Sequence, residues 1–308
     1  MARPPPKGVE MPASISKAAI ERAQTFVRAN ARPLDRAYLD YMSPSGGDET
    51  AFDRVIGELE RYQTPEGGFG NAIEPDIRSP APSAIGTSIA FQCLRATDAP
   101  ADLPMVRRAI DYLVRTVDRT AWVWPAVDAR VDEGPHAPWW APGLDRFRGY
   151  VFNPTAELLG YLYDYRADVP GEVLQGVTST VLEALDRVGR LDSAYELYCC
   201  MRLIHTKALP TDVRDFLEQR LTVSLVAADP DDPHLNLMRI APTPSSFGYE
   251  LVRDGVARQA ARLIAAQGDD GGWRPGWEPW HAKAHQEWAG VITSQALVGL
   301  AAHGFWAD

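Results

Sequence analysis

Amphipathic segments recur along the chain, each followed by a segment without a polar face, and this alternation constrains the fold more than any other feature. In the amphipathic class, apolar residues return every three or four positions and charged residues fill the other faces, as in a helix with one buried side. These segments are 53–63, 104–117 and 249–267. Stretches of strand length that alternate apolar and polar residues are nearly absent. The sequence therefore predicts an all-α protein.

The segments of the second class are apolar or small almost all round, with charges mostly at their ends. They are 83–96, 155–165 and 289–302, and each follows an amphipathic helix and a loop. A helix without a solvent face must be surrounded by protein. An outer layer of amphipathic helices around an inner layer of buried helices satisfies both classes. We therefore expect an α/α toroid of about six helical hairpins in two concentric layers.

Two of the loops between these layers repeat the same spacing. Segment 59–69 has the form L-x-x-x-Q-x-x-x-G-G-F, and segment 263–273 has the form L-x-x-x-Q-x-x-x-G-G-W. A glutamine at a helix end can cap free backbone groups, two glycines permit a tight turn, and the aromatic ring covers the exit of the turn. A weaker copy lies around 113–124. Such self-similarity indicates an array of equivalent hairpins.

These segments resemble the QW-type repeats of the superfamily that contains squalene–hopene cyclases, class II terpene cyclases and protein prenyltransferases, whose fold is an α/α toroid. Segments 63–69 and 267–273 match the repeat well, and 117–230 matches it poorly. Three further segments resemble single-toroid bacterial proteins described as cyclase- or prenyltransferase-like: 68–80, 135–140 and 287–297. The resemblance leaves the activity open, because toroids also carry glycosidases, lyases and binding proteins.

Composition excludes several classes of protein. Of the 308 residues, 45% are hydrophobic and 23% are charged, as in globular domains, and no apolar run reaches the ~18–20 residues of a membrane-spanning helix. A net charge of −10 disfavours a nucleic-acid partner. Three cysteines provide neither a disulfide framework nor a common zinc spacing. We expect a cytoplasmic protein with a proline-rich tail over 1–14, a single domain over 15–308, and no cofactor.

Chemistry is expected in the loops that lead into the buried helices, because these loops face the centre of a toroid. The first loop holds Glu74, Asp76 and Arg78, with prolines that stiffen it. Two carboxyl groups beside a guanidinium can form a general acid with a shifted pKa, with Arg78 contacting the substrate. Alternatively, one carboxylate pairs with Arg78 and closes the loop.

The second loop combines one histidine with two tryptophans, His136, Trp139 and Trp140. A histidine in an apolar pocket can donate or accept a proton. Indole faces can stabilise carbocations, by up to ~2 kcal/mol each when desolvated, or stack on sugar rings. The alternative is that these tryptophans only plug one mouth of the ring.

The third loop, 273–288, contains four of the nine tryptophans and precedes the last buried helix. Trp277, Trp280 and His281 are candidates for substrate binding, and Glu287 is a candidate base. His281 lies four residues before His285, a spacing that suits a metal on a helix, but no HExxH arrangement accompanies it and we predict no metal site.

A literal D-x-D-D match at 229–232 makes Asp231 a competing candidate acid. Class II terpene cyclases hold their protonating aspartate in this pattern, and clustered carboxylates raise one another's pKa. The prolines on either side, however, favour an acidic turn that ends a helix. The magnesium motifs of class I cyclases and the zinc set of protein prenyltransferases are missing.

The resemblance implies a terpene-cyclase-like enzyme that holds an apolar, isoprenoid-like small molecule in an aromatic-lined central cavity. Asp76 or Glu74 would protonate an alkene or epoxide, and a base near His136 or Glu287 would remove a proton from the cation.

Two other readings remain open. A glycoside hydrolase or lyase would use Asp76 with Glu278 or Glu287 as acid and base across a sugar linkage. A binding toroid without catalysis would use the acidic loops only as structural caps.

Overall fold

The computed structural model describes residues 14–44, 46–144 and 148–307, and the statements below refer to these residues. Over these ranges the chain forms twelve α-helices and three short 3-10 helices, with isolated β-bridges in place of strands. The proposed tail therefore lies almost wholly outside the described residues.

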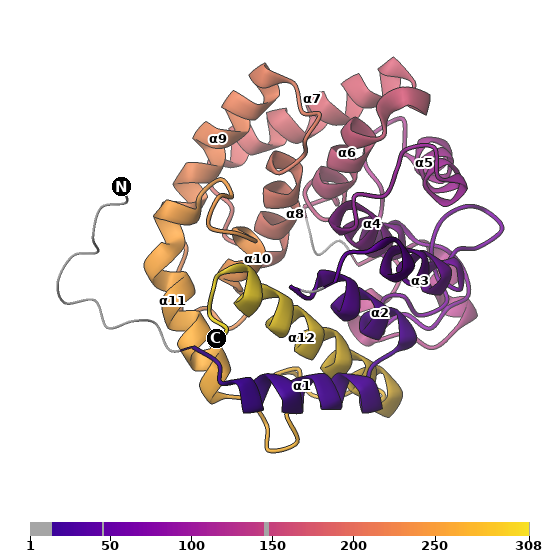
Figure 1. The fold of residues 1–308 in the computed structure, drawn as a ribbon. Coiled ribbons are helices and arrows are strands. Elements are labelled where there is room, and N and C mark those ends of the chain that lie inside the picture. Colours follow the sequence, from indigo (N-terminus) through magenta and orange to yellow (C-terminus); the bar gives the residue numbers. More distant parts are fainter. Residues whose placement is uncertain (1–13, 45, 145–147, 308) are drawn as a thin grey trace.

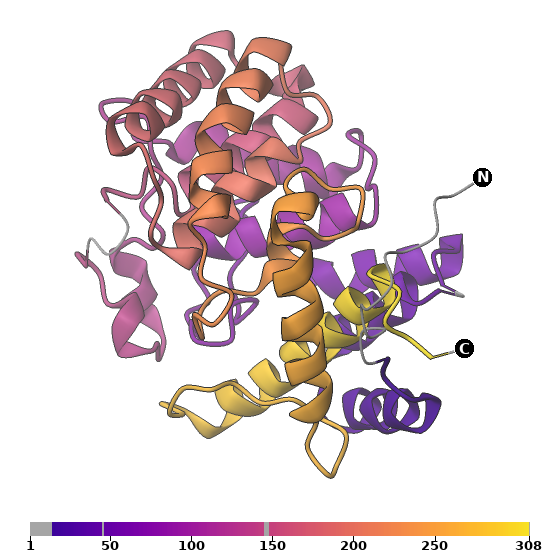
Figure 2. The ribbon, with the colours of Figure 1, turned by 90° about the vertical axis from the view of Figure 1, so that its left-hand side faces the viewer.

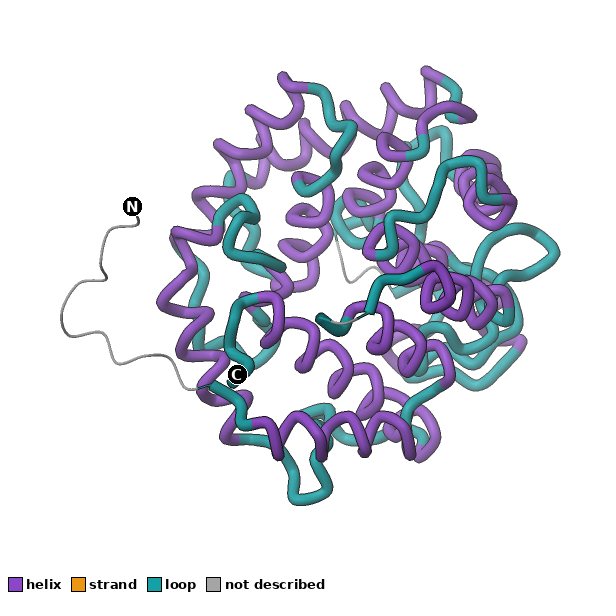
Figure 3. The backbone as a smooth tube through the Cα atoms, in the orientation of Figure 1, coloured by secondary structure: helices purple, strands orange, loops and turns teal. Residues whose placement is uncertain are grey.

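Helices alternate between an outer and an inner layer (Figures 1 and 3). The outer helices are α1 (Lys17–Asn30), α3 (Glu49–Glu60), α5 (Pro104–Thr116), α7 (Gly171–Val188), α9 (Thr211–Val226) and α11 (Tyr249–Ala265). The inner helices are α2 (Pro33–Met42), α4 (Ala84–Ala96), α6 (Thr155–Asp164), α8 (Ala194–Ile204), α10 (Leu237–Ile240) and α12 (Ala282–Ala302). The 3-10 helices are η1 (Ala129–Glu133), η2 (Pro138–Trp140) and η3 (Arg166–Asp168). The predicted α/α toroid of about six hairpins is confirmed.

The ring closes where the last hairpin meets the first. Helix α12 packs against both α1 and α2, and Figures 1 and 2 both place the chain beyond α12 beside the start of α1. Backbone hydrogen bonds join Ile15 N to Phe305 O at 2.8 Å and Ala307 N to Ile15 O at 3.0 Å. Ile15 is fully buried in this seam.

Glutamines tie each repeated turn to the next outer helix. Gln63 Nε2 donates to Gly67 O at 2.8 Å within its own turn and to Met105 O at 2.9 Å at the start of α5. Gln267 makes the equivalent bonds, to Gly271 O at 3.0 Å and Ala19 O at 2.9 Å. The shared spacing therefore encodes a shared joint between neighbouring hairpins.

The aromatic residue of each turn is fixed in the same way in all three copies of the repeat. Its backbone N–H donates to a threonine hydroxyl on the following inner helix: Phe69 to Thr87 at 3.1 Å, Trp124 to Thr155 at 3.0 Å, and Trp273 to Thr293 at 2.9 Å. The weaker copy around 113–124 thus has the geometry of the stronger ones.

Two features of the inner layer differ from the sequence prediction. Helix α12 begins at Ala282 rather than 289, because His281 caps it by accepting a hydrogen bond from Ala284 N and no proline interrupts the next two turns. Helix α10 has a single turn, Leu237–Ile240, so the fifth hairpin has a shortened inner arm. Among the helices of the described residues, none has the length and apolar character needed to cross a membrane.

Candidate active site

Loops that lead from outer to inner helices meet at one end of the ring. The first and second predicted loops pair directly, since Ile77 and His136 form an antiparallel bridge. Arg78 N donates to Pro135 O at 2.8 Å, and Ala137 N donates to Asp76 O at 2.9 Å. The backbone on both sides of Asp76 is therefore held by the second loop.

The third loop and the start of α12 complete this assembly. Trp280 Nε1 donates to Asp76 Oδ1 at 2.5 Å. The Arg78 guanidinium binds both carboxylate oxygens of Glu287, at 2.7 and 3.3 Å. The structure thus brings together predicted residues from three loops that are about 60 to 210 positions apart in the sequence.

Arg32, which sequence analysis missed, supports the first loop from inside the ring. Its Nη1 donates to Ala72 O at 3.0 Å and Ile73 O at 2.8 Å, and its other donors bind both carboxylate oxygens of Asp35. Burial lowers the pKa of Arg32, but the charge and hydrogen bond of Asp35, together with Tyr62 and Glu287, outweigh this and raise it. Arg32 therefore remains charged and fixes the backbone immediately before Glu74.

The two carboxyl groups of the first loop are removed from water, with Glu74 5% and Asp76 3% exposed. Burial raises the pKa of Glu74 to about 8, and the nearby Asp76 charge adds to this effect. Burial also raises the pKa of Asp76, although indole N–H groups and Arg78 oppose it. Both groups are thereby shifted toward the protonated form.

Four tryptophans surround this carboxyl pair, Trp139, Trp140, Trp280 and Trp288, and we call them the indole cluster. The indoles of Trp139 and Trp288, like that of Trp280, favour ionised Asp76, and that of Trp140 favours ionised Glu74. The N–H groups of Trp140 and Trp288 are buried and make no well-formed hydrogen bond with the described residues. They are available to strengthen their contacts when a carboxylate forms.

Other predicted residues lie beside the carboxyl pair without joining it. Trp277 is 40% exposed and packs edge-on against Trp288, with ring centroids 5.5 Å apart. His281 stacks near Trp280 and caps α12. His136 Nδ1 faces Ala137 O at 3.0 Å and Nε2 faces the exposed Asp132 at 2.9 Å. Both ring nitrogens of His136 are thus directed at oxygen atoms of its own loop.

The D-x-D-D turn is not part of this assembly. Asp231 lies on the surface with 67% of its side chain exposed, and it forms an ion pair with Arg262 of outer helix α11. The prolines that flank the turn account for this position, because they end α9 and leave the acidic residues in a surface loop.

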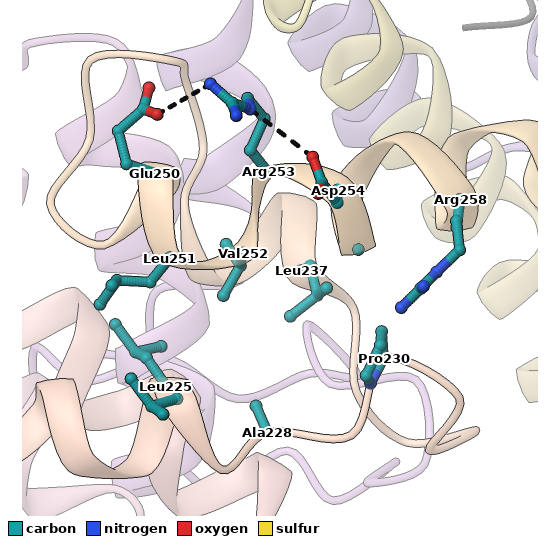
Figure 4. A pocket seen from close by; sticks show the side chains of 12 residues that line it. Leu225, Ala228, Pro230, Leu237, Glu250, Leu251, Val252, Arg253, Asp254 and Arg258 are labelled. Carbon is teal, nitrogen blue, oxygen red and sulfur yellow. Dashed lines mark hydrogen bonds and ion pairs between the residues drawn. The ribbon is translucent and has the colours of Figure 1, made fainter. Parts of the chain in front are cut away.

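Two cavities lie away from the carboxyl pair. One of about 200 Å³ opens between α9, α10 and α11 and is lined by residues such as Leu225, Leu237 and Arg258 (Figure 4). Its charged residues Glu250, Arg253 and Asp254 pair with one another. The other, of about 160 Å³, is lined by 190–194 and the loop after α9. Neither has polar groups that converge on a reacting atom.

Residues able to ligate a metal do not gather in the described part of the chain. No group of three or more His, Cys, Asp or Glu side chains is placed to hold an ion there.

Comparisons with known proteins add little to this geometry. No protein-family model matches the chain, and no curated protein matches it. Among solved structures, two of type II terpene cyclase MstE from Scytonema are similar, one with geranylgeranyl dihydroxybenzoate as substrate and one without ligand. Each has 12% sequence identity and a TM-score of 0.49, covering 92% of this chain and 96% of the other. Similarity at this level carries no argument about chemistry.

Proposed function

We propose that the chain is an enzyme that protonates an apolar, isoprenoid-like small molecule, with Asp76 as the acid. The observation that supports this best is the carboxyl pair, buried at the meeting point of three loops and enclosed by indoles. A carboxyl group must be protonated to donate to an alkene or epoxide, and burial raises the pKa of Asp76 toward this form.

Asp76 fits the role of donor better than Glu74 because its surroundings stabilise the product of the transfer. Trp280 donates to Oδ1, which leaves Oδ2 to carry the proton. As the O–H bond breaks and a C–H bond forms on the substrate, negative charge develops on Asp76. Fixed N–H donors from Trp280 and its neighbours stabilise that charge without rearrangement.

The indole cluster serves the other half of the reaction. Protonation leaves a carbocation, and tryptophan rings attract a cation through their electron-rich faces. Glu287, which forms an ion pair with Arg78, is the group that accepts a proton from the cation. The proton taken from Asp76 and the proton lost by the substrate balance, so the net reaction is an isomerisation such as cyclisation.

The test is conversion of linear polyprenyl substrates and their terminal epoxides, with product analysis by mass spectrometry. We expect Asp76→Asn to reduce turnover by about 10²–10⁴, the usual contribution of a general acid, and to keep the folded state. Asp231→Asn, which alters the rival surface carboxylate, should leave turnover unchanged. Full activity in Asp76→Asn, or no conversion of any chain length by the unaltered protein, would overturn the proposal.

A further inference from the structure

A second group of charged side chains lies inside the ring, on the inner helices rather than the loops. Glu157 of α6 is 1% exposed and binds Arg202 of α8, with Oε2 2.8 Å from Nη1. Tyr161 donates to the other carboxylate oxygen at 2.6 Å, and Cys199 Sγ lies 3.5 Å from Oε2. Both carboxylate oxygens of Glu157 thus have partners among the neighbouring side chains.

Arg239 of the short helix α10 adds a positive charge to this group without a partner for it. Its guanidinium lies over the ring of Tyr198, 4.5 Å from the centroid. Within the described residues it makes no ion pair and no side-chain hydrogen bond. Burial, followed by the nearby Arg202 charge, lowers the pKa of Arg239, so the fold disfavours this cation. One carboxylate therefore faces two guanidinium groups, leaving an excess of one positive charge.

These side chains come from four inner helices. The guanidinium groups of Arg202 and Arg239 lie 6.0 and 4.5 Å from the centroid of the Tyr198 ring. Burial raises the pKa of Tyr38 on α2, Cys93 of α4 adds to this, and the Arg202 charge opposes it. Helices α2, α4, α8 and α10 are separate inner helices, so the side chains approach one another across the interior. The side chains of Tyr38, Cys93, Arg202 and Arg239 nevertheless remain partly exposed. The phenol of Tyr38 has no hydrogen-bond partner among the described residues and is a free donor in this space.

We propose that Arg239, with Arg202 and the Tyr38 hydroxyl, binds an oxyanion inside the ring, a carboxylate or a phosphate at one end of an apolar ligand. A planar guanidinium offers paired donors to such a group. The anion supplies the negative charge that the interior lacks, and the orphan cation gains a partner. The identification of this ligand with the substrate rests on the proposed function, whereas its binding does not.

The ring of Tyr198 holds the guanidinium of Arg239 in one orientation. Tyr198 OH donates to His234 O at 2.7 Å and accepts a hydrogen bond from Asn236 N, which fixes the ring beside the α9–α10 loop. Stacking on this fixed ring orients the guanidinium without neutralising it. The shortened helix α10 thereby places a charged side chain, Arg239, in the interior of the ring.

Binding of three ligands with the same tail tests the proposal: octyl phosphate, octanoate and neutral octanol, measured by calorimetry on the full chain. We expect one or both anions to bind at least tenfold more tightly than octanol, and the better anion identifies the head group. Arg239→Met keeps the stacked stem and should abolish this preference. Arg187→Met, which alters an exposed arginine of α7, should retain it.

Thermal unfolding without ligand separates a binding role from a structural one. Because Arg239 is an unpaired, desolvated cation, Arg239→Met should melt at the same temperature as the unaltered chain or higher, and octyl phosphate or octanoate should no longer raise its Tm. Equal affinity for octanol, preserved anion preference in Arg239→Met, or a lowered Tm of that variant would each overturn the inference. Failure of the proposed function alone would appear as intact anion binding without turnover.

Discussion

At the scale of single residues, two neighbouring carboxyl groups have different surroundings. Glu74 is enclosed beneath the loop and accepts a hydrogen bond from Asp76 N, while Asp76 is bonded to Trp280. Burial penalises the ionised form of both, but the N–H donors around Asp76 reduce the penalty there. This difference is the reason that we propose Asp76, rather than Glu74, as the proton donor.

The pKa of Glu74 predicts a pH dependence of stability. Its pKa is about 8 in the folded chain against an ordinary value of 4.5, so between these values the folded state binds more protons than the unfolded state. The contribution is fully present below pH 4.5 and is lost as pH rises to about 8, at up to about 1.4 kcal/mol per pH unit. The Glu74→Gln side chain does not titrate. The free energy of unfolding, measured with denaturant from pH 5 to 8, should therefore fall more steeply with pH for the unaltered chain than for this variant. Parallel curves would contradict this explanation.

Sequence reasoning identified the residues of the site better than their contacts. Glu74, Asp76 and Trp280 stood out because acids and indoles gathered in loops before buried helices, and the loops do meet. Arg32 was missed because its partners are backbone carbonyls about 40 positions away, which leave no trace in residue type. Trp288 could have been found from the density of tryptophans in its loop. Arg239 could not be found from the sequence, because a helix of one turn is too short to show a periodic pattern of apolar residues.

At the scale of elements, the paired glycines at 67–68 and 271–272 shape how α3 and α11 pass into their inner partners. Gly67 has a φ of +96°, and an added Cβ would lie 2.4 Å from Arg108 O of α5. The turn therefore needs glycine for its backbone conformation and for its contact with the next hairpin. This explains why the spacing of the repeat was visible in the sequence, while the single-turn α10, which follows no such turn, was not.

Two glycine-to-alanine variants test the role of the turn. Gly67→Ala should destabilise the protein by about 1–3 kcal/mol, because alanine is strained at this φ and clashes with α5. Gly57→Ala lies on the exposed face of α3 with nothing near its Cβ, and should stabilise by about 0.5–1 kcal/mol through helix propensity. Chemical denaturation of both variants gives the comparison. If Gly67→Ala stabilised the protein as Gly57→Ala does, the turn would tolerate a side chain.

At the scale of the whole molecule, the toroid depends on a seam between residues at opposite ends of the described chain. Ile15 pairs with the segment after α12, and α12 packs against α1 and α2. The two-layer architecture followed from the two classes of helix, since each class has one environment that suits it. The contact that closes the ring could not be predicted, because Ile15 is an isolated apolar residue in a part of the sequence without periodicity.

Truncation of the seam residue should weaken the entire ring. Ile15 is 0% exposed, so Ile15→Ala should cost about 2–5 kcal/mol, the usual range for a buried isoleucine. Val226→Ala, at a position that is 68% exposed, should change stability by less than about 0.5 kcal/mol. Thermal melting of the two variants against the unaltered chain is the measurement. A neutral Ile15→Ala would mean that the ring holds without this contact.

The ion pair between Arg78 and Glu287 joins residues that are 209 positions apart in the sequence. During synthesis the acidic loop emerges long before α12, so the chain contains Asp76 for most of its translation without Trp280 and Trp288. The surroundings of the proton donor that we propose are therefore complete only when the final hairpin docks. If the proposed function is correct, completion of folding and onset of reactivity are a single event, and a chain that ends before α12 is inactive.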